Sequence, residues 1–173
     1  MLIDLRKLLS GTEDKSIVNA YVEGSVLDTG SSKYDIIDKK PFELTFTRTG
    51  KNKVSIKGSG SLTLDIPCDR CLKPVKTKVD FEIDQIVTFE GDKGWVEDEE
   101  QDYIDGYNLD VDKLVFTEVL LFIPGKTLCK DDCKGLCPVC GADLNIKDCG
   151  CDRESLDPRM SVFKDILNNF KEV

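Results

Sequence analysis

Eight cysteines in four close pairs constrain this chain more than any other feature of its sequence. Two pairs are C-x-x-C motifs, one is C-x-C, and one has its members four residues apart. Such pairs on tight turns favour tetrahedral zinc, because two neighbouring thiolates supply half of the coordination shell. The candidate metal ligands, in chain order, are Cys68 and Cys71, Cys129 and Cys133, Cys137 and Cys140, and Cys149 and Cys151. They suffice for one or two structural Zn²⁺ sites of four thiolates each.

The spacing of the pairs favours one division between two metal ions. The third and fourth pairs can meet through a short loop, which leaves the first pair to meet the second across a loop of about 60 residues. The entropic cost of closing a loop rises slowly with its length, so this connection is reasonable. The alternative division joins the second pair with the third and leaves the fourth for the first. Spacing also leaves open an iron-sulfur cluster, whose ligands are again four thiolates.

The composition removes most catalytic schemes. The chain has 0 histidines, which excludes Ser-His, Cys-His and His-metal centres. A metal ion held by four thiolates has no open position for water, so it supports folding and does not activate a nucleophile. No serine or lysine motif replaces these groups. We therefore expect no enzyme activity and no catalytic residues.

Charge is concentrated in one segment. The net charge is -9, and residues 92–112 contain nine acidic residues and one lysine. Because like charges repel, we predict a solvated or disordered acidic loop over residues 91–112. Its carboxylates would be the candidates if the protein were instead a metal-dependent nuclease.

The location of the protein follows from what the sequence lacks. No stretch approaches the ~20 apolar residues of a membrane-spanning helix. The N-terminus has no basic front, long apolar stretch or cleavage site of a signal peptide. We expect a cytoplasmic protein that does not contact a membrane, in which disulfides are not expected.

Apolar and polar residues alternate along most of the chain between residues 42 and 89. This period of two is typical of half-buried strands. Turn-forming residues at 49–52 and 58–60 predict breaks between hairpin strands. A further strand is expected at 17–27, and a short amphipathic helix at 1–9. The pattern predicts a curled, mostly antiparallel and barrel-like sheet.

Two longer helices are predicted in the second half of the chain. Asp110 or Asp112 can cap the first, which ends before Pro124 and covers one face of the sheet. The second begins at residues 157–158 and carries an apolar stripe to Phe170.

The fold class is therefore α+β, with two parts. Residues 1–124 form the sheet domain with its covering helix. Residues 125–173 form a cysteine-rich zinc module and a terminal helix that packs on the first part.

The motifs around the cysteines resemble those of the YceD family. The sequence C-D-R-C-L-K-P at residues 68–74 matches the family's C-x-R-C-L-x-P signature. Residues 133–145, C-K-G-L-C-P-V-C-G-A-D-L-N, are similar to its long, cysteine-rich form, and D-P-R at 157–159 resembles its ending. The resemblance implies a non-catalytic accessory factor in ribosome biogenesis, which supports accumulation or processing of large-subunit ribosomal RNA. The implied partner is that RNA or a ribosomal protein.

The resemblance also implies a functional surface near the first cysteine pair, because some family members keep that pair and lack the later ones. Basic residues surround it and occupy the strands before it, where they could meet RNA phosphates or serve as solubilising edge charges. The candidate RNA-binding residues are Lys51, Lys53, Lys57, Arg70, Lys73, Lys76 and Lys78. Two alternatives to a role in ribosome biogenesis remain. One is a redox-responsive zinc-thiolate protein, which releases its metal on oxidation, and the other is the metal-dependent nuclease.

Overall fold

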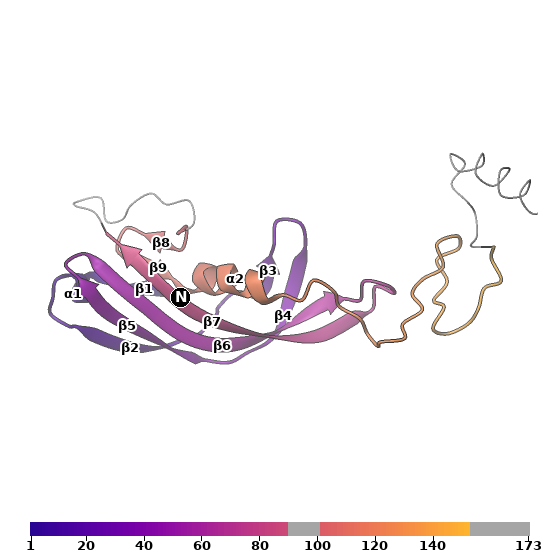
Figure 1. Cartoon of the computed structure of the whole chain (residues 1–173), viewed down its shortest axis with the longest axis horizontal. Coiled ribbons are helices and arrows are strands. Elements are labelled where there is room, and N and C mark those ends of the chain that lie inside the picture. Colours follow the sequence, from indigo (N-terminus) through magenta and orange to yellow (C-terminus); the bar gives the residue numbers. More distant parts are fainter. Residues whose placement is uncertain (90–100, 153–173) are drawn as a thin grey trace, which may run out of the picture.

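A computed structural model describes residues 1–89 and 101–152 of the chain. The described part is mostly antiparallel β-sheet with few helices, as expected for the α+β class (Figure 1). Its elements are β1 (Leu2–Asp4), α1 (Arg6–Leu9), β2 (Lys15–Ala20), β3 (Val26–Asp28), β4 (Lys33–Lys39), β5 (Phe42–Gly50), β6 (Lys53–Pro67), β7 (Pro74–Thr88), β8 (Ile104–Asp105), β9 (Asn108–Asp110) and α2 (Val111–Phe122). The predicted terminal helix lies outside the described residues, and the division near residue 124 stays a prediction.

The β6–β7 hairpin is the long axis of the molecule (Figure 1). Its strands pair in unbroken register from Lys53 opposite Thr88 to Pro67 opposite Pro74. On the other side of β6, β5 pairs with the first half of the strand and β4 with the second half. β2 extends the sheet from β5, and β3 extends it from β4. The hairpin therefore carries its own turn to one end of the sheet.

The predicted break at residues 58–60 is wrong, because β6 runs straight through them. A Cβ atom at Gly58 would lie 2.7 Å from the backbone oxygen of Glu43, and one at Gly60 would lie 2.7 Å from the Phe81 ring. These glycines thus mark close approach of neighbours inside a strand, where β6 changes partner from β5 to β4, and not a turn.

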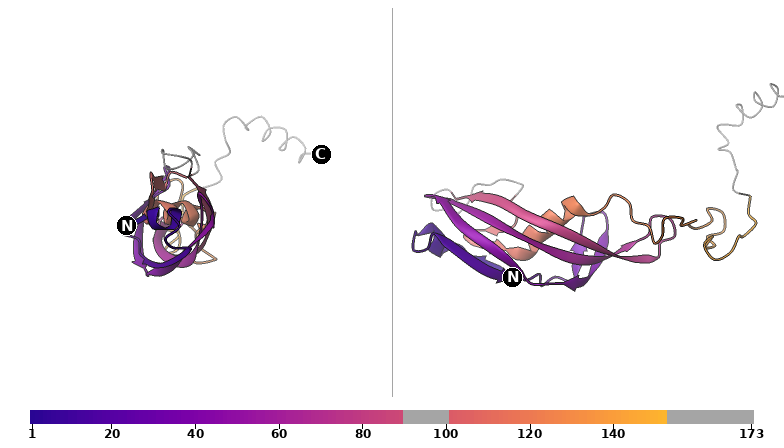
Figure 2. Two further views of the ribbon diagram at one scale, coloured as in Figure 1. Left: turned by 90° about the vertical axis from the view of Figure 1, so that its left-hand side faces the viewer. Right: turned by 60° about the horizontal axis from the view of Figure 1, so that its bottom comes forward.

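The sheet is curled but open. In the described strands the order is β2-β5-β6-β4-β3, with β7 paired to β6 alone, so no pairing closes a circle. Seen end on, the strands curve around α2 (Figure 2). The curled, mostly antiparallel sheet is as predicted, whereas the barrel is not confirmed.

Helix α2 covers the sheet as predicted. The Asp110 side chain caps it by accepting hydrogen bonds from the backbone N–H groups of Asp112 and Lys113. Its buried face, which includes Leu114 and Val119, joins the same core as the inward residues of β5, β6 and β7. Neither helix in residues 1–89 and 101–152 is long and apolar enough to span a bilayer.

Two other local predictions are corrected by pairing between distant segments. The N-terminus was predicted helical over residues 1–9, but β1 pairs with β9 and leaves α1 only Arg6–Leu9. The end of the predicted acidic loop is also ordered. There β8 and β9 form a hairpin, and β9 pairs with β1. Residues 90–100 of the acidic segment lie outside the described residues. The strand predicted at 17–27 is likewise two strands, β2 and β3.

The close approach at Gly58 predicts a sharp effect of adding one methyl group. Gly58→Ala should lower the free energy of unfolding by about 2 kcal/mol, because the methyl group meets backbone that cannot move aside cheaply. Gly50→Ala in β5 is the matched control, since its nearest neighbour would be at 3.7 Å, and it should change stability by less than about 0.5 kcal/mol. Urea unfolding followed by far-UV circular dichroism measures both. Equal stability of the two variants would contradict the packing described.

Candidate metal centre

The turn of the β6–β7 hairpin carries the first two cysteines. We call residues 68–73 the hairpin tip. The Cys68 N–H donates to the Lys73 carbonyl at 2.8 Å, and the Leu72 N–H donates to the Cys68 carbonyl at 2.9 Å. Leu72 takes the left-handed conformation with φ of 59°. This tight turn buries both cysteine side chains, as expected for a C-x-x-C motif at the end of a strand.

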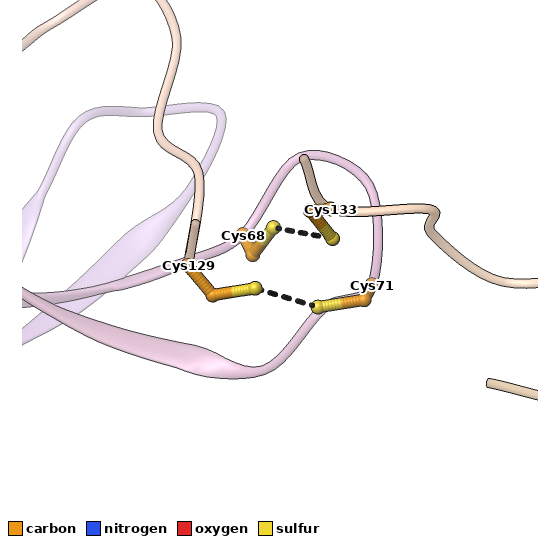
Figure 3. A group of neighbouring side chains, drawn as sticks. All are labelled: Cys68, Cys71, Cys129 and Cys133. Carbon is orange, nitrogen blue, oxygen red and sulfur yellow. Dashed lines mark hydrogen bonds between the residues drawn. The ribbon is translucent and has the colours of Figure 1, made fainter. Parts of the chain in front are cut away.

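The chain that follows α2 brings two further cysteines to the hairpin tip. Cys129 and Cys133 lie against the first pair, and the remaining described residues extend beyond the tip (Figures 1 and 3). The sulfur atoms of Cys68 and Cys133 are 3.9 Å apart, and those of Cys71 and Cys129 are 3.5 Å apart. All four sulfur atoms lie within 4.8 Å of one another. We call these four residues the first thiolate group.

The last four cysteines form a second thiolate group. The sulfur atoms of Cys137, Cys140, Cys149 and Cys151 also lie within 4.8 Å of one another. Cys137 is buried and Cys140 is exposed, while the other two are half-buried. The sulfur atoms are thus grouped according to the division that the spacing favours, and not according to its alternative.

The geometry of both groups fits a single metal ion. Four thiolates bound tetrahedrally to zinc at about 2.3 Å have neighbouring sulfurs about 3.8 Å apart. The two sulfur separations in the first group, 3.5 and 3.9 Å, bracket that value. They are also far longer than a disulfide bond of about 2.05 Å. Each group could therefore hold one metal ion, whose identity the geometry alone does not fix.

In the first group, the surroundings of Cys68 favour its thiolate form, whereas those of Cys129 favour its neutral thiol. Burial raises the pKa of the Cys68 thiol, but backbone N–H groups that donate to its sulfur outweigh burial and lower the pKa from 9.0 to about 6. Hydrogen bonding with the Cys71 sulfur and burial raise the pKa of Cys129 to about 12. Peptide N–H groups are aimed at a sulfur anion, while the crowded sulfurs repel further negative charge. A divalent cation at the centre would offset that repulsion.

The second group has the same imbalance. Backbone N–H groups of Cys140 and Val139 lower the pKa of Cys137 from 9.0 to about 6, despite its burial. Hydrogen bonding with Cys140 and Cys149 raises the pKa of Cys151 to about 12. Each group therefore contains at least one cysteine whose thiolate is stabilised by backbone N–H groups, and one whose pKa is raised by its neighbours.

Backbone hydrogen bonds fasten the cysteine module, residues 126–152, to the hairpin tip. Asp69 and Thr127 bond reciprocally, with the Asp69 N–H donating to the Thr127 carbonyl at 2.9 Å and the Asp69 carboxylate accepting from the Thr127 N–H at 2.7 Å. The Leu136 N–H donates to the Arg70 carbonyl at 3.0 Å. Gly135 has φ of 76°, and a Cβ atom there would lie 2.8 Å from that carbonyl. The module is thus hydrogen-bonded to the tip on both sides of the Cys129 and Cys133 pair.

A polar network that sequence analysis missed supports the first thiolate group. The Lys73 ammonium pairs with the Asp143 carboxylate at 2.7 Å, and this contact is the main cause of the lowering of the Asp143 pKa to about 2. The Asn145 amide donates to the same carboxylate at 2.8 Å and to the Cys133 sulfur at 3.5 Å. The sequence signal for this network is the A-D-L-N segment after the third cysteine pair.

The predicted RNA-binding residues do not form one patch. Lys51 and Lys53 lie at the β5–β6 turn, whereas Lys76 is opposite Asp65, 12 residues farther along β6. At ~3.3 Å per residue, these two basic regions are roughly 40 Å apart.

Several of these basic side chains already have partners. Arg70 donates to the Cys133 carbonyl at 2.6 Å, and Lys73 holds Asp143. Lys57 pairs with Asp84 at 2.9 Å, and Lys78 pairs with Asp80 at 2.6 Å. In the part of the chain that the structure describes, Lys51, Lys53 and Lys76 have no such partner. Arg70 and Lys73 thus support the metal centre, and RNA contact by the set stays a prediction.

Two described acids of the predicted acidic loop have structural roles. Asp110 caps α2, and the Asp112 carboxylate accepts from the N–H groups of Glu23 and Gly24. Among residues 1–89 and 101–152, the clusters with metal-ligating potential are the two thiolate groups. The acids at 92–100 lie outside the described residues, so a carboxylate site there has no structural support.

Comparison with known families places the region that contains both thiolate groups in one of them. The sequence matches the family described as "Large ribosomal RNA subunit accumulation protein YceD" over residues 56–167, which is more than half of the chain. The chain belongs to the YceD family. The matched range begins within β6 and contains both thiolate groups, so the family's characteristic region includes the whole metal centre.

Relatives of the chain are known from mycobacteria. They include "Uncharacterized protein Mb2951c" of Mycobacterium bovis and "Uncharacterized protein Rv2926c" of Mycobacterium tuberculosis, each 31% identical over 103 residues. The alignments cover 58% of this chain and 49% of each relative, so the chain spans about half the length of these curated relatives. No solved structure matches the chain.

The first thiolate group predicts a specific loss when its hairpin ligands are removed. The double variant Cys68→Ser and Cys71→Ser should bind one metal ion fewer per chain, and trypsin should then cut at Lys126 and Lys130 because the module is no longer fastened to the tip. Native mass spectrometry measures the metal count and peptide mapping locates the cuts. Cys140→Ser with Cys149→Ser is the matched control, which should lose the other ion and keep the 126–130 segment protected at excess Zn²⁺. Unchanged metal content in the first variant would contradict the grouping.

Proposed function

We propose that the protein is a non-catalytic accessory factor in the accumulation of large-subunit ribosomal RNA, and that it acts in the cytoplasm by binding that RNA or a ribosomal protein. Membership of the YceD family carries this proposal, because the family's description names the process. The family match covers the hairpin tip and the cysteine module.

The chemistry of the thiolate groups supports a role without catalysis. A metal ion bound by four sulfurs has no free position for water or substrate. The first group joins a hairpin turn to a later segment, and the second closes a loop within that segment, so a metal ion in either would contribute to folding. We propose structural Zn²⁺ in both groups, because four sulfurs that lie within 4.8 Å of one another suit one tetrahedral ion better than a cluster of several irons.

The basic β5–β6 turn is the favoured place for phosphate contact. Lys51 and Lys53 are exposed and hold no ion pair within the described residues, so both charges are available to a polyanion. Arg70 and Lys73 are less suited to this role, since each is already bound to the cysteine module.

Redox-controlled metal release is the second candidate function. It is favoured by the exposure of the second thiolate group, in which Cys140 is exposed and Cys149 and Cys151 are half-buried. Thiolates that are accessible to an oxidant are the ones that react. Mild peroxide would then release metal from the second group while the first group, in which Cys129 is exposed and the other three cysteines are buried, keeps its own. A purely structural protein would retain both ions.

Sedimentation of cell extracts tests the proposed function. The tagged full-length chain should sediment with large-subunit precursor particles, and cells that lack it should contain less large-subunit than small-subunit ribosomal RNA. Ribonuclease treatment before the gradient separates the two kinds of partner, because association through RNA would be lost and association through a ribosomal protein would persist. A chain that stays at the top of the gradient, in cells whose two ribosomal RNAs are balanced without it, would overturn the proposal.

The same gradient tests the basic turn. Lys51→Glu with Lys53→Glu should reduce the RNA that copurifies with the chain by about 10-fold, since two phosphate contacts become repulsive. Lys51→Arg with Lys53→Arg keeps both charges and should retain association. If the glutamate variant binds as much RNA as the original chain, the basic turn is not the contact surface.

A further inference from the structure

Asn145 lies in the sequence between cysteines of the second thiolate group, but its side chain contacts a cysteine of the first. It lies between Cys140 and Cys149, in the loop that the second thiolate group closes. Its side chain nevertheless donates from Nδ2 to the sulfur of Cys133, in the first group, at 3.5 Å. The two groups therefore share a structural element that is not itself a ligand.

The orientation of the Asn145 amide is fixed by its other partners. Its Oδ1 accepts from the backbone N–H of Lys134 at 2.9 Å, so its Nδ2 must face the opposite way. Nδ2 also donates to the Asp143 carboxylate at 2.8 Å, and the Asn145 backbone N–H donates to that carboxylate at 2.9 Å. Asp143 in turn is held at 2.7 Å by Lys73 of the hairpin tip. Both polar ends of the amide are thus occupied, and one of them is aimed at sulfur.

Residues of the second group flank the loop that presents Asn145. The Cys137 N–H donates to the Ala142 backbone carbonyl at 2.8 Å, and the Gly141 N–H donates to the Cys137 carbonyl at 2.8 Å. These bonds fold residues 137–142 into the knuckle of the second group. Farther along, Cys149 and Cys151 are joined to that knuckle by the sulfur cluster. A metal ion there would close the loop on both sides of Asn145.

We infer that Asn145 is a positioning residue for the first thiolate group, and that through it a metal ion in the second group strengthens metal binding in the first. The inference rests on the proposed binding of metal by both groups. A metal ion in the second group fixes the loop, the loop fixes the Asn145 amide, and the amide stabilises the Cys133 thiolate. By thermodynamic linkage, the first ion strengthens binding of the second by the same factor.

The buried position of Cys133 makes this hydrogen bond effective. Its exposed fraction is 1%, so water does not compete for the sulfur. Hydrogen bonds to groups that ligate a metal typically change its affinity by about 10- to 100-fold. We therefore expect coupling of about 10-fold between the two groups.

Competition with a chromophoric zinc chelator measures the coupling in the full-length, reduced chain. Three overall Zn²⁺ affinities are needed: that of the intact chain, that of Cys140→Ser with Cys149→Ser, and that of Cys68→Ser with Cys71→Ser. The two-ion affinity of the intact chain should exceed the product of the two single-group affinities by about 10-fold. A single-group variant that binds no Zn²⁺, beside an intact chain that binds two ions, would indicate stronger coupling still.

Variants of Asn145 show whether the coupling passes through its amide. Asn145→Ala removes the whole network, and Asn145→Asp keeps an acceptor for Lys134 but removes the donor to Cys133. Both variants should lower the two-ion affinity by about 10-fold. The ratio of the two-ion affinity to the product of the two single-group affinities should then be near one. Ile146→Ala is the matched control, since Ile146 is 76% exposed, and it should leave the ratio unchanged. Far-UV circular dichroism verifies that the sheet is retained.

The outcomes separate this inference from the proposed function. A ratio near one in the intact chain, or a ratio that persists in both Asn145 variants, would overturn the coupling while leaving two zinc sites in place. An intact chain that binds no Zn²⁺ would overturn both the coupling and the proposed structural zinc.

Discussion

The meeting of four sulfur atoms at the hairpin tip is the contact on which the rest of the molecule depends. It joins the turn of a continuous sheet to a segment that begins 58 residues later along the chain. Around it, the Asp69–Thr127 bonds and the Arg70 contacts hold backbone that forms little regular structure of its own. The hydrophobic cluster beside the sulfurs is small, so cross-linking by the proposed metal ions would be the main physical reason for the arrangement of residues 126–152.

The sheet explains why this contact is made at one end of the molecule. β6 and β7 are each 15 residues long, and their paired length carries the tip away from the core around α2. Gly58 and Gly60 let β6 remain continuous while its neighbour changes, because they leave room for a carbonyl and an aromatic ring. The first thiolate group thus lies apart from that core, at the end of the hairpin.

Local sequence patterns predicted the parts of the structure that depend on local chemistry. The alternation predicted β5, β7 and the two halves of β6, and Asp110 was one of the two residues predicted to cap α2. The spacing of the cysteines predicted how their sulfurs are grouped. The errors arose where contacts between distant segments determine the structure. Residues 2–4 form a strand because they pair with β9, and Gly58 lies inside a strand, close to β5, and not in a turn. Asn145 could not be linked to Cys133 from sequence, because that contact exists only after the loop has folded.

X-ray absorption at the zinc edge, on native protein purified without added metal, tests the central claim most directly. We predict two zinc ions per chain, each with four sulfur ligands at about 2.3 Å. A folded chain with empty, reduced thiols would contradict the account, as would iron in place of zinc or a shell containing oxygen from water.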